Sequence, residues 1–166
     1  MGVSHVFTHR SLPKKQESEE ARVFTKILMV CVGNICRSPT AEVLLRHRVG
    51  GKGIRVESAG LAALSGSPID PVAREILESQ GLSADGHVAR QLDAALIDAS
   101  DLVLAMEGRH VRAIHRIAPH ARGKTFLLGK WQDDAPIPDP YRQDRTVFEH
   151  TYRMIDAAVE SWRTYL

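Results

Sequence analysis

Cysteine is nearly absent from this 166-residue sequence, which contains only Cys31 and Cys36. Two thiols are too few for the disulfide framework of a small secreted protein. A zinc site is not expected either, because a pair with this spacing lacks the further ligands of a tetrahedral site. In a reducing cytoplasm, two such thiols indicate catalysis or metal binding rather than a structural disulfide. We expect neither a metal nor another cofactor.

Charge of one sign and long apolar runs are also lacking. The formal net charge is only +2, and no run of Lys and Arg is interleaved with aromatic residues, which argues against a nucleic-acid binder. No apolar stretch approaches the roughly 18 residues that span a membrane. The first 20 residues contain no apolar core of the signal-peptide kind. We therefore expect a cytoplasmic protein without stable membrane insertion.

The chain divides into a polar extension and one domain. Residues 1–24 are polar and patternless, which predicts a disordered or loosely attached extension, whereas residues 25–166 have the length of a single domain. Apolar runs alternate with amphipathic segments, which predicts an α/β domain with a parallel sheet and helices on both faces. The expected strands cover residues 27–30, 54–58, 102–106 and 126–128. The expected helices cover residues 39–48, 70–80, 92–99, 109–117 and a last segment from about 145, and residues 130–143 are expected to form a loop.

The strongest local pattern is CVGNICRS, which begins at Cys31 where an apolar strand turns into a helix. Backbone N–H groups in such a loop form a nest for an anion, and the helix N-terminus adds partial positive charge. Gly33 and Asn34 best tolerate the positive φ angles that a nest requires. The residues expected to bind phosphate here are Val32, Gly33, Asn34, Ile35, Cys36 and Ser38.

Two side chains of this loop are suited to phosphoryl chemistry. A thiolate at Cys31 would be stabilised by the helix N-terminus and a neighbouring cation, and the thiolate is the nucleophilic form. Arg37 offers a planar fork that can hold two phosphate oxygens. Ser38 either donates a hydrogen bond to the thiolate or caps the helix. A Cys and an Arg at this distance also occur by chance, so the strand and helix around them carry the interpretation.

These residues resemble a known family. The segment ILMVCVGNICRSPTAE (residues 27–42) looks like the signature of the low-molecular-weight protein-tyrosine phosphatases, and the resemblance extends from Lys26 to Leu166. SAG (residues 58–60) matches the second loop of that family, and IPDPY (residues 137–141) matches its acid loop. Leu61, HVARQL (residues 87–92) and MEGRH (residues 106–110) are most similar to bacterial members encoded beside capsule or exopolysaccharide tyrosine kinases.

The resemblance implies a fold, a reaction and further site residues. The fold would be a three-layer, flavodoxin-like α/β domain with four parallel strands in the order 2-1-3-4. The enzyme would hydrolyse phosphotyrosine through a cysteinyl phosphate, with Asp139 as acid and then base. Two prolines stiffen the chain around Asp139, although an Asp in such a loop can also be a simple turn residue. Tyr141 and Leu61 would form opposite walls beside the substrate ring, and Cys36 would either pair with Cys31 on oxidation or only pack.

The implied partners are a phosphotyrosine protein, such as a cognate bacterial tyrosine kinase, and phosphate-like or sulfate-like anions in the loop. Two rivals remain. A thiol-dependent arsenate reductase shares this fold and loop but needs two further cysteines, and none follows Cys36. A non-catalytic phosphotyrosine-binding module would be expected to lack the nucleophile, the Arg or the Asp. The eight histidines show no metal-ligand spacing, so we assign them to the surface or to packing.

Overall fold

The computed structural model describes residues 23–166, which form a four-stranded parallel sheet in the order β2-β1-β3-β4. The α/β class and the strand order expected from the sequence are both confirmed. The strands are β1 (Lys26–Cys31), β2 (Arg55–Gly60), β3 (Leu102–Ala105) and β4 (Thr125–Leu127). The helices are α1 (Arg37–Arg48), α2 (Pro71–Ser79), α3 (Ala94–Asp98), α4 (Gly108–Ile117) and α5 (Arg145–Arg163), with short 3₁₀ segments η1 (Pro119–Lys124) and η2 (Leu128–Trp131).

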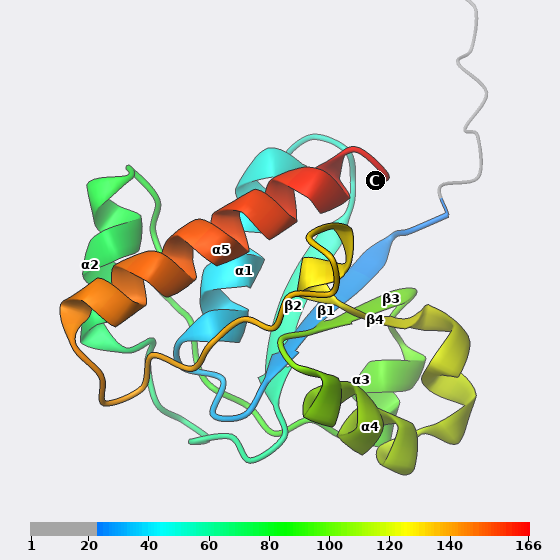
Figure 1. Cartoon of the computed structure of the whole chain (residues 1–166). Helices are drawn as coiled ribbons and strands as arrows, with labels where there is room; N and C mark the ends of the chain where they lie inside the picture. The colour runs from blue at the N-terminus through cyan, green and yellow to red at the C-terminus, as the bar shows by residue number, and fades with distance from the viewer. Residues whose placement is uncertain (1–22) are drawn as a thin grey trace, which may run out of the picture.

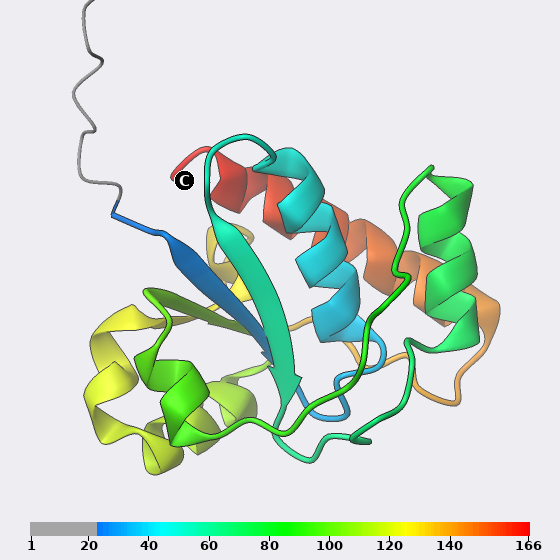
Figure 2. The same ribbon diagram turned by 180° about the vertical axis from the view of Figure 1, so that it is seen from behind.

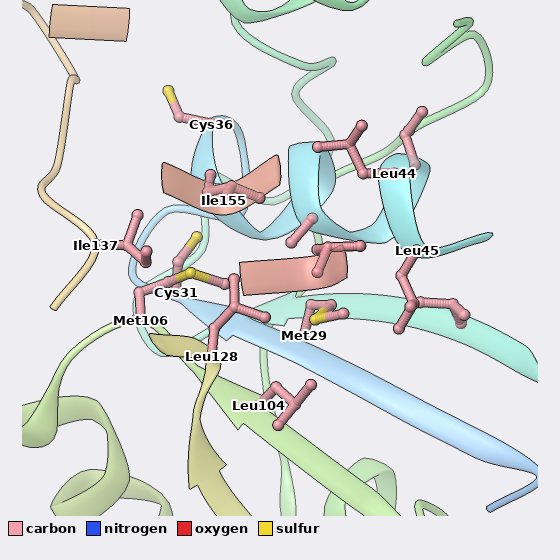
Figure 3. Packing of buried hydrophobic residues seen from close by; sticks show 14 of the residues in the cluster. Met29, Cys31, Cys36, Leu44, Leu45, Leu104, Met106, Leu128, Ile137 and Ile155 are labelled. Carbon is pink, nitrogen blue, oxygen red and sulfur yellow. The ribbon is translucent and has the colours of Figure 1, made fainter. Parts of the chain in front are cut away.

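Helices cover both faces of the sheet (Figures 1 and 2), with α1, α2 and α5 on one side and α3 and α4 on the other. Successive side chains of a strand point to opposite faces of the sheet, so β1 contributes to the hydrophobic core on both faces. Ile27 and Met29 join the larger core cluster under α1 and α5, whereas Leu28 and Val30 join the cluster under α3 and α4. Burial on both faces explains why this strand reads as a continuous apolar run. Figure 3 shows the larger cluster, which includes Cys31.

The helix boundaries follow local chemistry with small departures from the predictions. α2 begins where expected, because the Asp70 carboxylate accepts the Val72 N–H at 2.9 Å and Pro71 occupies the first helical position. α1 begins at Arg37 instead of Pro39, with Cys36 rather than Ser38 as its N-cap. The segments η1 and η2 were not predicted, and η2 occupies the start of the expected loop from residue 130.

The expected extension over residues 1–24 lies outside the described residues except for its last two positions. Within residues 23–166, no helix combines the length and the apolar character needed to cross a membrane.

We predict that two isoleucines of α4 differ sharply in their contribution to stability. Ile114 is fully buried in the cluster between α4 and the sheet, whereas Ile117, one turn later, is 40% exposed. Ile114→Ala should lower the free energy of unfolding by about 2–5 kcal/mol, because it leaves a cavity. Ile117→Ala should lower it by less than about 1 kcal/mol. Urea unfolding at pH 7 measures both, and equal losses would contradict this packing of α4.

Candidate active site

Cys31 ends β1 at the carboxyl edge of the sheet. Its strand lies between β2 and β3. The chain passes from β1 to β2 toward one edge of the sheet, and then from β2 through β3 to β4 toward the other edge. Open parallel sheets bind ligands at such a switch point, outside the carboxyl ends of the strands. Residues 32–36 form the loop from Cys31 to α1, so the N-terminus of α1 faces the same space. The fold thus places a thiol and a helix N-terminus together.

The loop takes the conformation of an anion nest at Asn34. This residue has φ of +58°, as the sequence predicted, whereas Gly33 does not adopt a positive φ. The backbone N–H of Asn34 points at the Cys31 Sγ, 3.3 Å away. Gly60 of β2 packs against the loop, where an added Cβ would lie 2.4 Å from the Val32 carbonyl oxygen. A side chain at Gly60 would therefore displace the loop.

Asn34 is also the hub that holds the loop in place. Its side chain is fully buried and donates to the hydroxyls of Ser38 and Ser58, each at 2.9 Å. Its side-chain oxygen accepts the backbone N–H of Arg90 at 2.9 Å, and its backbone oxygen accepts a hydrogen bond from His87 Nε2 at 2.7 Å. Because every polar group of Asn34 is paired, the loop is rigidly tied to β2 and to residues 87–90.

Ser38 contacts the nucleophile candidate instead of capping the helix. Its Oγ lies 2.9 Å from the Cys31 Sγ. The Asn34 amide already donates to this oxygen, so the hydroxyl hydrogen of Ser38 is free to point at the sulfur. Of the two roles that the sequence left open, the cap is not observed, because Cys36 is the N-cap of α1. A hydroxyl in this position can donate a hydrogen bond to the sulfur of Cys31.

Arg37 is a buried cation beside the loop, only 2% exposed. Its Nη1 donates to Glu107 Oε1 at 2.6 Å and to the carbonyl oxygen of Ile137 at 2.9 Å. Its Nη2 lies 3.4 Å from Asp139 Oδ2. The guanidinium of Arg37 therefore joins the start of α1 to the β3–α4 junction and to the proline-rich segment. It also brings Arg37 into contact with Asp139, another predicted catalytic side chain.

Glu107, which the sequence reasoning missed, is the main counter-charge of Arg37. Burial acts to raise the pKa of this carboxyl, but hydrogen bonds from Arg109 and Arg37 outweigh burial and hold the pKa below its ordinary value. Glu107 directly follows Met106 at the carboxyl end of β3. An acidic residue immediately after a buried strand was the available signal, because the carboxyl ends of parallel strands share one edge.

Asp139 stands at the mouth of the site on the expected loop. Its side chain is 42% exposed, and its Oδ1 accepts the backbone N–H of Tyr141 at 3.1 Å. The loop is anchored to α5 by Thr151, whose hydroxyl donates to the Pro138 carbonyl oxygen at 3.3 Å. The Asp139 carboxyl is therefore open to solvent while one of its oxygens stays oriented.

A pocket of about 170 Å³ opens above the loop and collects most of the predicted side chains. It is lined by Cys31, Val32, Gly33, Ile35, Cys36, Arg37, Ala62, Leu64, Asp139 and Tyr141. Leu61, expected on its rim, instead packs against the core cluster under α3 and α4. The residues that follow it along the turn, Ala62 and Leu64, reach the pocket in its place. Asn34 and Ser38 lie beneath the pocket as supports.

Cys36 is a second free thiol beside the first. Burial raises the pKa of the Cys36 thiol well above its ordinary value, and the charge of Asp70 acts in the same direction, so Cys36 remains protonated at neutral pH. In Figure 3 its side chain points away from Cys31. A bond between the two would need a rotation of the Cys36 side chain, and this pairing stays a prediction.

The comparisons with known proteins agree with this geometry. A family model described as low molecular weight phosphotyrosine protein phosphatase matches residues 26–166. The chain is 45% identical over 139 residues to low molecular weight protein-tyrosine-phosphatase Etp of Escherichia coli (strain K12), an alignment that covers 84% of this chain and 93% of Etp.

Solved structures show the same fold. Vibrio vulnificus Wzb in complex with benzylphosphonate has a TM-score of 0.82 and 46% identity, covering 86% of this chain and 99% of Wzb. YwlE arginine phosphatase from Geobacillus stearothermophilus has a TM-score of 0.80 and 32% identity, covering 85% of this chain and 92% of YwlE. With a family model that spans nearly all of the described residues, the chain belongs to the family of low molecular weight phosphotyrosine protein phosphatases.

Proposed function

We propose that this protein hydrolyses phosphotyrosine in proteins, with Cys31 as nucleophile, Arg37 as phosphate clamp and Asp139 as general acid. The observation that carries the proposal is the convergence of these three side chains on one pocket, with the thiol at the N-terminus of α1 and Arg37 Nη2 3.4 Å from Asp139. Asp139 lies more than 100 residues after Cys31 and Arg37 in the sequence. Their common lining of one pocket supports joint action in one reaction.

The first step is attack of the Cys31 thiolate on phosphorus. The S–P bond forms and the bond from phosphorus to the tyrosyl oxygen breaks, while Asp139 gives its proton to that oxygen. Arg37 and the N–H groups of residues 32–37 hold the three remaining phosphate oxygens. Ser38 stabilises the thiolate before attack and again when it leaves.

The second step releases phosphate. Asp139, now a carboxylate, takes a proton from a water molecule that attacks phosphorus, and the S–P bond breaks to restore the Cys31 thiolate. One carboxyl thus acts as acid and then as base. Its exposure of 42% suits this exchange with water, because the same group must meet both the leaving oxygen and the incoming water.

The pocket walls favour an aromatic ring over a charged group. Ile35, Leu64 and Tyr141 present apolar surface above the loop. The bound benzylphosphonate of Vibrio vulnificus Wzb also carries an aromatic ring on a phosphonate, which supports this substrate class. Related YwlE is named an arginine phosphatase, so phosphoarginine is the natural comparison substrate. A guanidinium is strongly polar, and apolar walls would leave its N–H groups unpaired.

We infer that the physiological partner is a phosphotyrosine protein, and specifically a bacterial tyrosine kinase that controls polysaccharide synthesis or export in the cytoplasm. The support is the resemblance of residues 87–92 and 106–110 to phosphatases encoded beside such kinases. We further propose that the domain spans residues 25–166 and that residues 1–24 form an extension to it.

The nucleophile and clamp can be tested together. Cys31→Ser should retain less than about 1% of the turnover of a phosphotyrosine peptide and still bind inorganic phosphate, because the hydroxyl is a poor nucleophile. Arg37→Lys should also fail, since a point charge does not replace a bidentate fork. Wild-type protein should prefer the phosphotyrosine peptide to a phosphoarginine peptide. Substantial turnover by Cys31→Ser would overturn the assignment of the nucleophile.

The role of Asp139 should show in its dependence on the leaving group. General acids typically contribute about 10²–10⁴-fold, and a leaving group of high pKa needs the proton most. Asp139→Asn should therefore slow the burst phase of a phosphotyrosine peptide far more than that of dinitrophenyl phosphate. Asp133→Asn is a suitable control, because Asp133 does not line the pocket and Asn tolerates its φ of +54°. An equal loss for all leaving groups would mean that Asp139 only shapes its loop.

The second thiol gives a redox prediction. Peroxide should oxidise the Cys31 thiolate to a sulfenic acid, which condenses with the Cys36 thiol to a disulfide and water. A dithiol should then restore activity, and mass spectrometry should show the loss of two hydrogens. Cys36→Ser should instead lose activity irreversibly through further oxidation. Full recovery of this variant would leave Cys36 with a packing role only.

A further inference from the structure

His110 lies directly behind the phosphate clamp in the first turn of α4. It is 2% exposed, and neither ring nitrogen has a hydrogen-bond partner among residues 23–166. An unpaired buried polar group typically costs about 1–3 kcal/mol. Such a group in a native protein calls for an explanation beyond packing, because a phenyl ring would fill similar space without that cost.

The unpaired ring faces the counter-charge of Arg37. His110 Nε2 lies 3.7 Å from Glu107 Oε1, the same oxygen that accepts from Arg37 Nη1 at 2.6 Å. A hydrogen bond requires about 2.7–3.2 Å, so a movement of roughly half an ångström or more would close it. Residues three apart share one face of a helix turn, which fixes this approach of His110 to Glu107.

The ring is neutral at neutral pH, so it carries one N–H. Burial lowers the pKa of His110 to about 4, and the charge of Arg37 acts in the same direction. The groups whose charges act on the ring are Arg37, Glu107, Arg109 and Asp139. A neutral imidazole can donate to Glu107 without adding a charge to a site that must bind an anion.

A phosphate dianion changes the demands on Glu107. Its charge competes with the Glu107 carboxylate for the single positive charge of Arg37, which weakens the bond between them. Glu107 then needs another donor, and Arg109, which already donates to both of its oxygens, is largely exposed. The buried N–H of His110 is placed to supply that hydrogen bond.

We propose that His110 is a positioning residue, whose imidazole N–H bonds to Glu107 when phosphate binds and so keeps Glu107 and Arg37 in place. This inference rests on the proposed phosphate site. The bond is stronger in the phosphate complex than in the free protein, so it contributes to binding and to the transition state rather than to folding.

Stability and anion binding should therefore respond in opposite ways to His110→Phe. The variant removes both unpaired nitrogens, so its free energy of unfolding at pH 7 should be no lower than that of wild type. Its dissociation constant for inorganic phosphate, measured by calorimetry, should rise roughly tenfold, the range for a hydrogen bond to a charged group. KM for a phosphotyrosine peptide should rise by a similar factor.

Two further variants provide matched controls. In His110→Gln the side-chain amide nitrogen stands at the same number of bonds from Cα as the imidazole Nε2, so phosphate binding should return to within about threefold of wild type. His115→Phe removes another imidazole of α4 whose Nε2 is buried and unpaired. Burial and the charge of Arg122, rather than that of Arg37, lower the pKa of His115. The phosphate affinity of this variant should match wild type.

The imidazole proton gives a direct signature. In wild-type protein the N–H resonance of His110 should move downfield when inorganic phosphate is added, as the bond to Glu107 shortens. Unchanged phosphate affinity in His110→Phe, or a resonance that ignores phosphate, would overturn the role of His110. If wild-type protein neither bound phosphate nor hydrolysed phosphotyrosine, the proposed function itself would fall, and this inference with it.

Discussion

The guanidinium of Arg37 is a permanent positive charge that the fold removes almost completely from water, with 2% of the residue exposed. Removing such a charge from water is costly unless it is paired and hydrogen-bonded. Glu107, the Ile137 carbonyl oxygen and Asp139 supply that pairing, and each comes from a segment distant from Arg37 in the sequence. The need to satisfy this cation therefore ties residues 137–139 and the β3–α4 junction to the loop that follows Cys31.

The loop around Cys31 is rigid for a different reason. Its backbone N–H groups must point inward to receive an anion, a conformation that has no regular secondary structure to support it. Asn34 replaces that support with side-chain and backbone hydrogen bonds to Ser38, Ser58, His87 and Arg90. Donors fixed before the substrate arrives need no reorganisation during the reaction. The same network leaves the Ser38 hydroxyl directed at the sulfur, so structural and chemical roles meet in one side chain.

The two carboxylates that approach Arg37 differ in environment, which suits them to different proposed roles. Glu107 is 22% exposed and held by two arginines, so it stays charged and serves as a fixed counter-ion. Asp139 is more exposed and makes the longer contact with Arg37, 3.4 Å against 2.6 Å. A group that carries a proton must meet both substrate and water, and the more exposed Asp139 suits that role. The buried cation of Arg37 needs a partner that stays charged at neutral pH, and Glu107 suits that role.

Local pattern alone determined the strands, most helices and the strand–loop–helix junction at Cys31, because apolar periodicity and capping are properties of neighbouring residues. The apolar run before Cys31 and the helix after Arg37 marked the junction, and the proline-flanked Asp139 came from the family resemblance. Only the tertiary structure decided which side chains meet across the sheet. It placed Ala62 and Leu64 instead of Leu61 at the pocket, assigned Ser38 to the sulfur and brought Glu107 and His110 behind Arg37. The contact between Glu107 and Arg37 joins segments that are distant in the chain. All of these relations depend on the direction of each side chain, which spacing along the sequence does not encode.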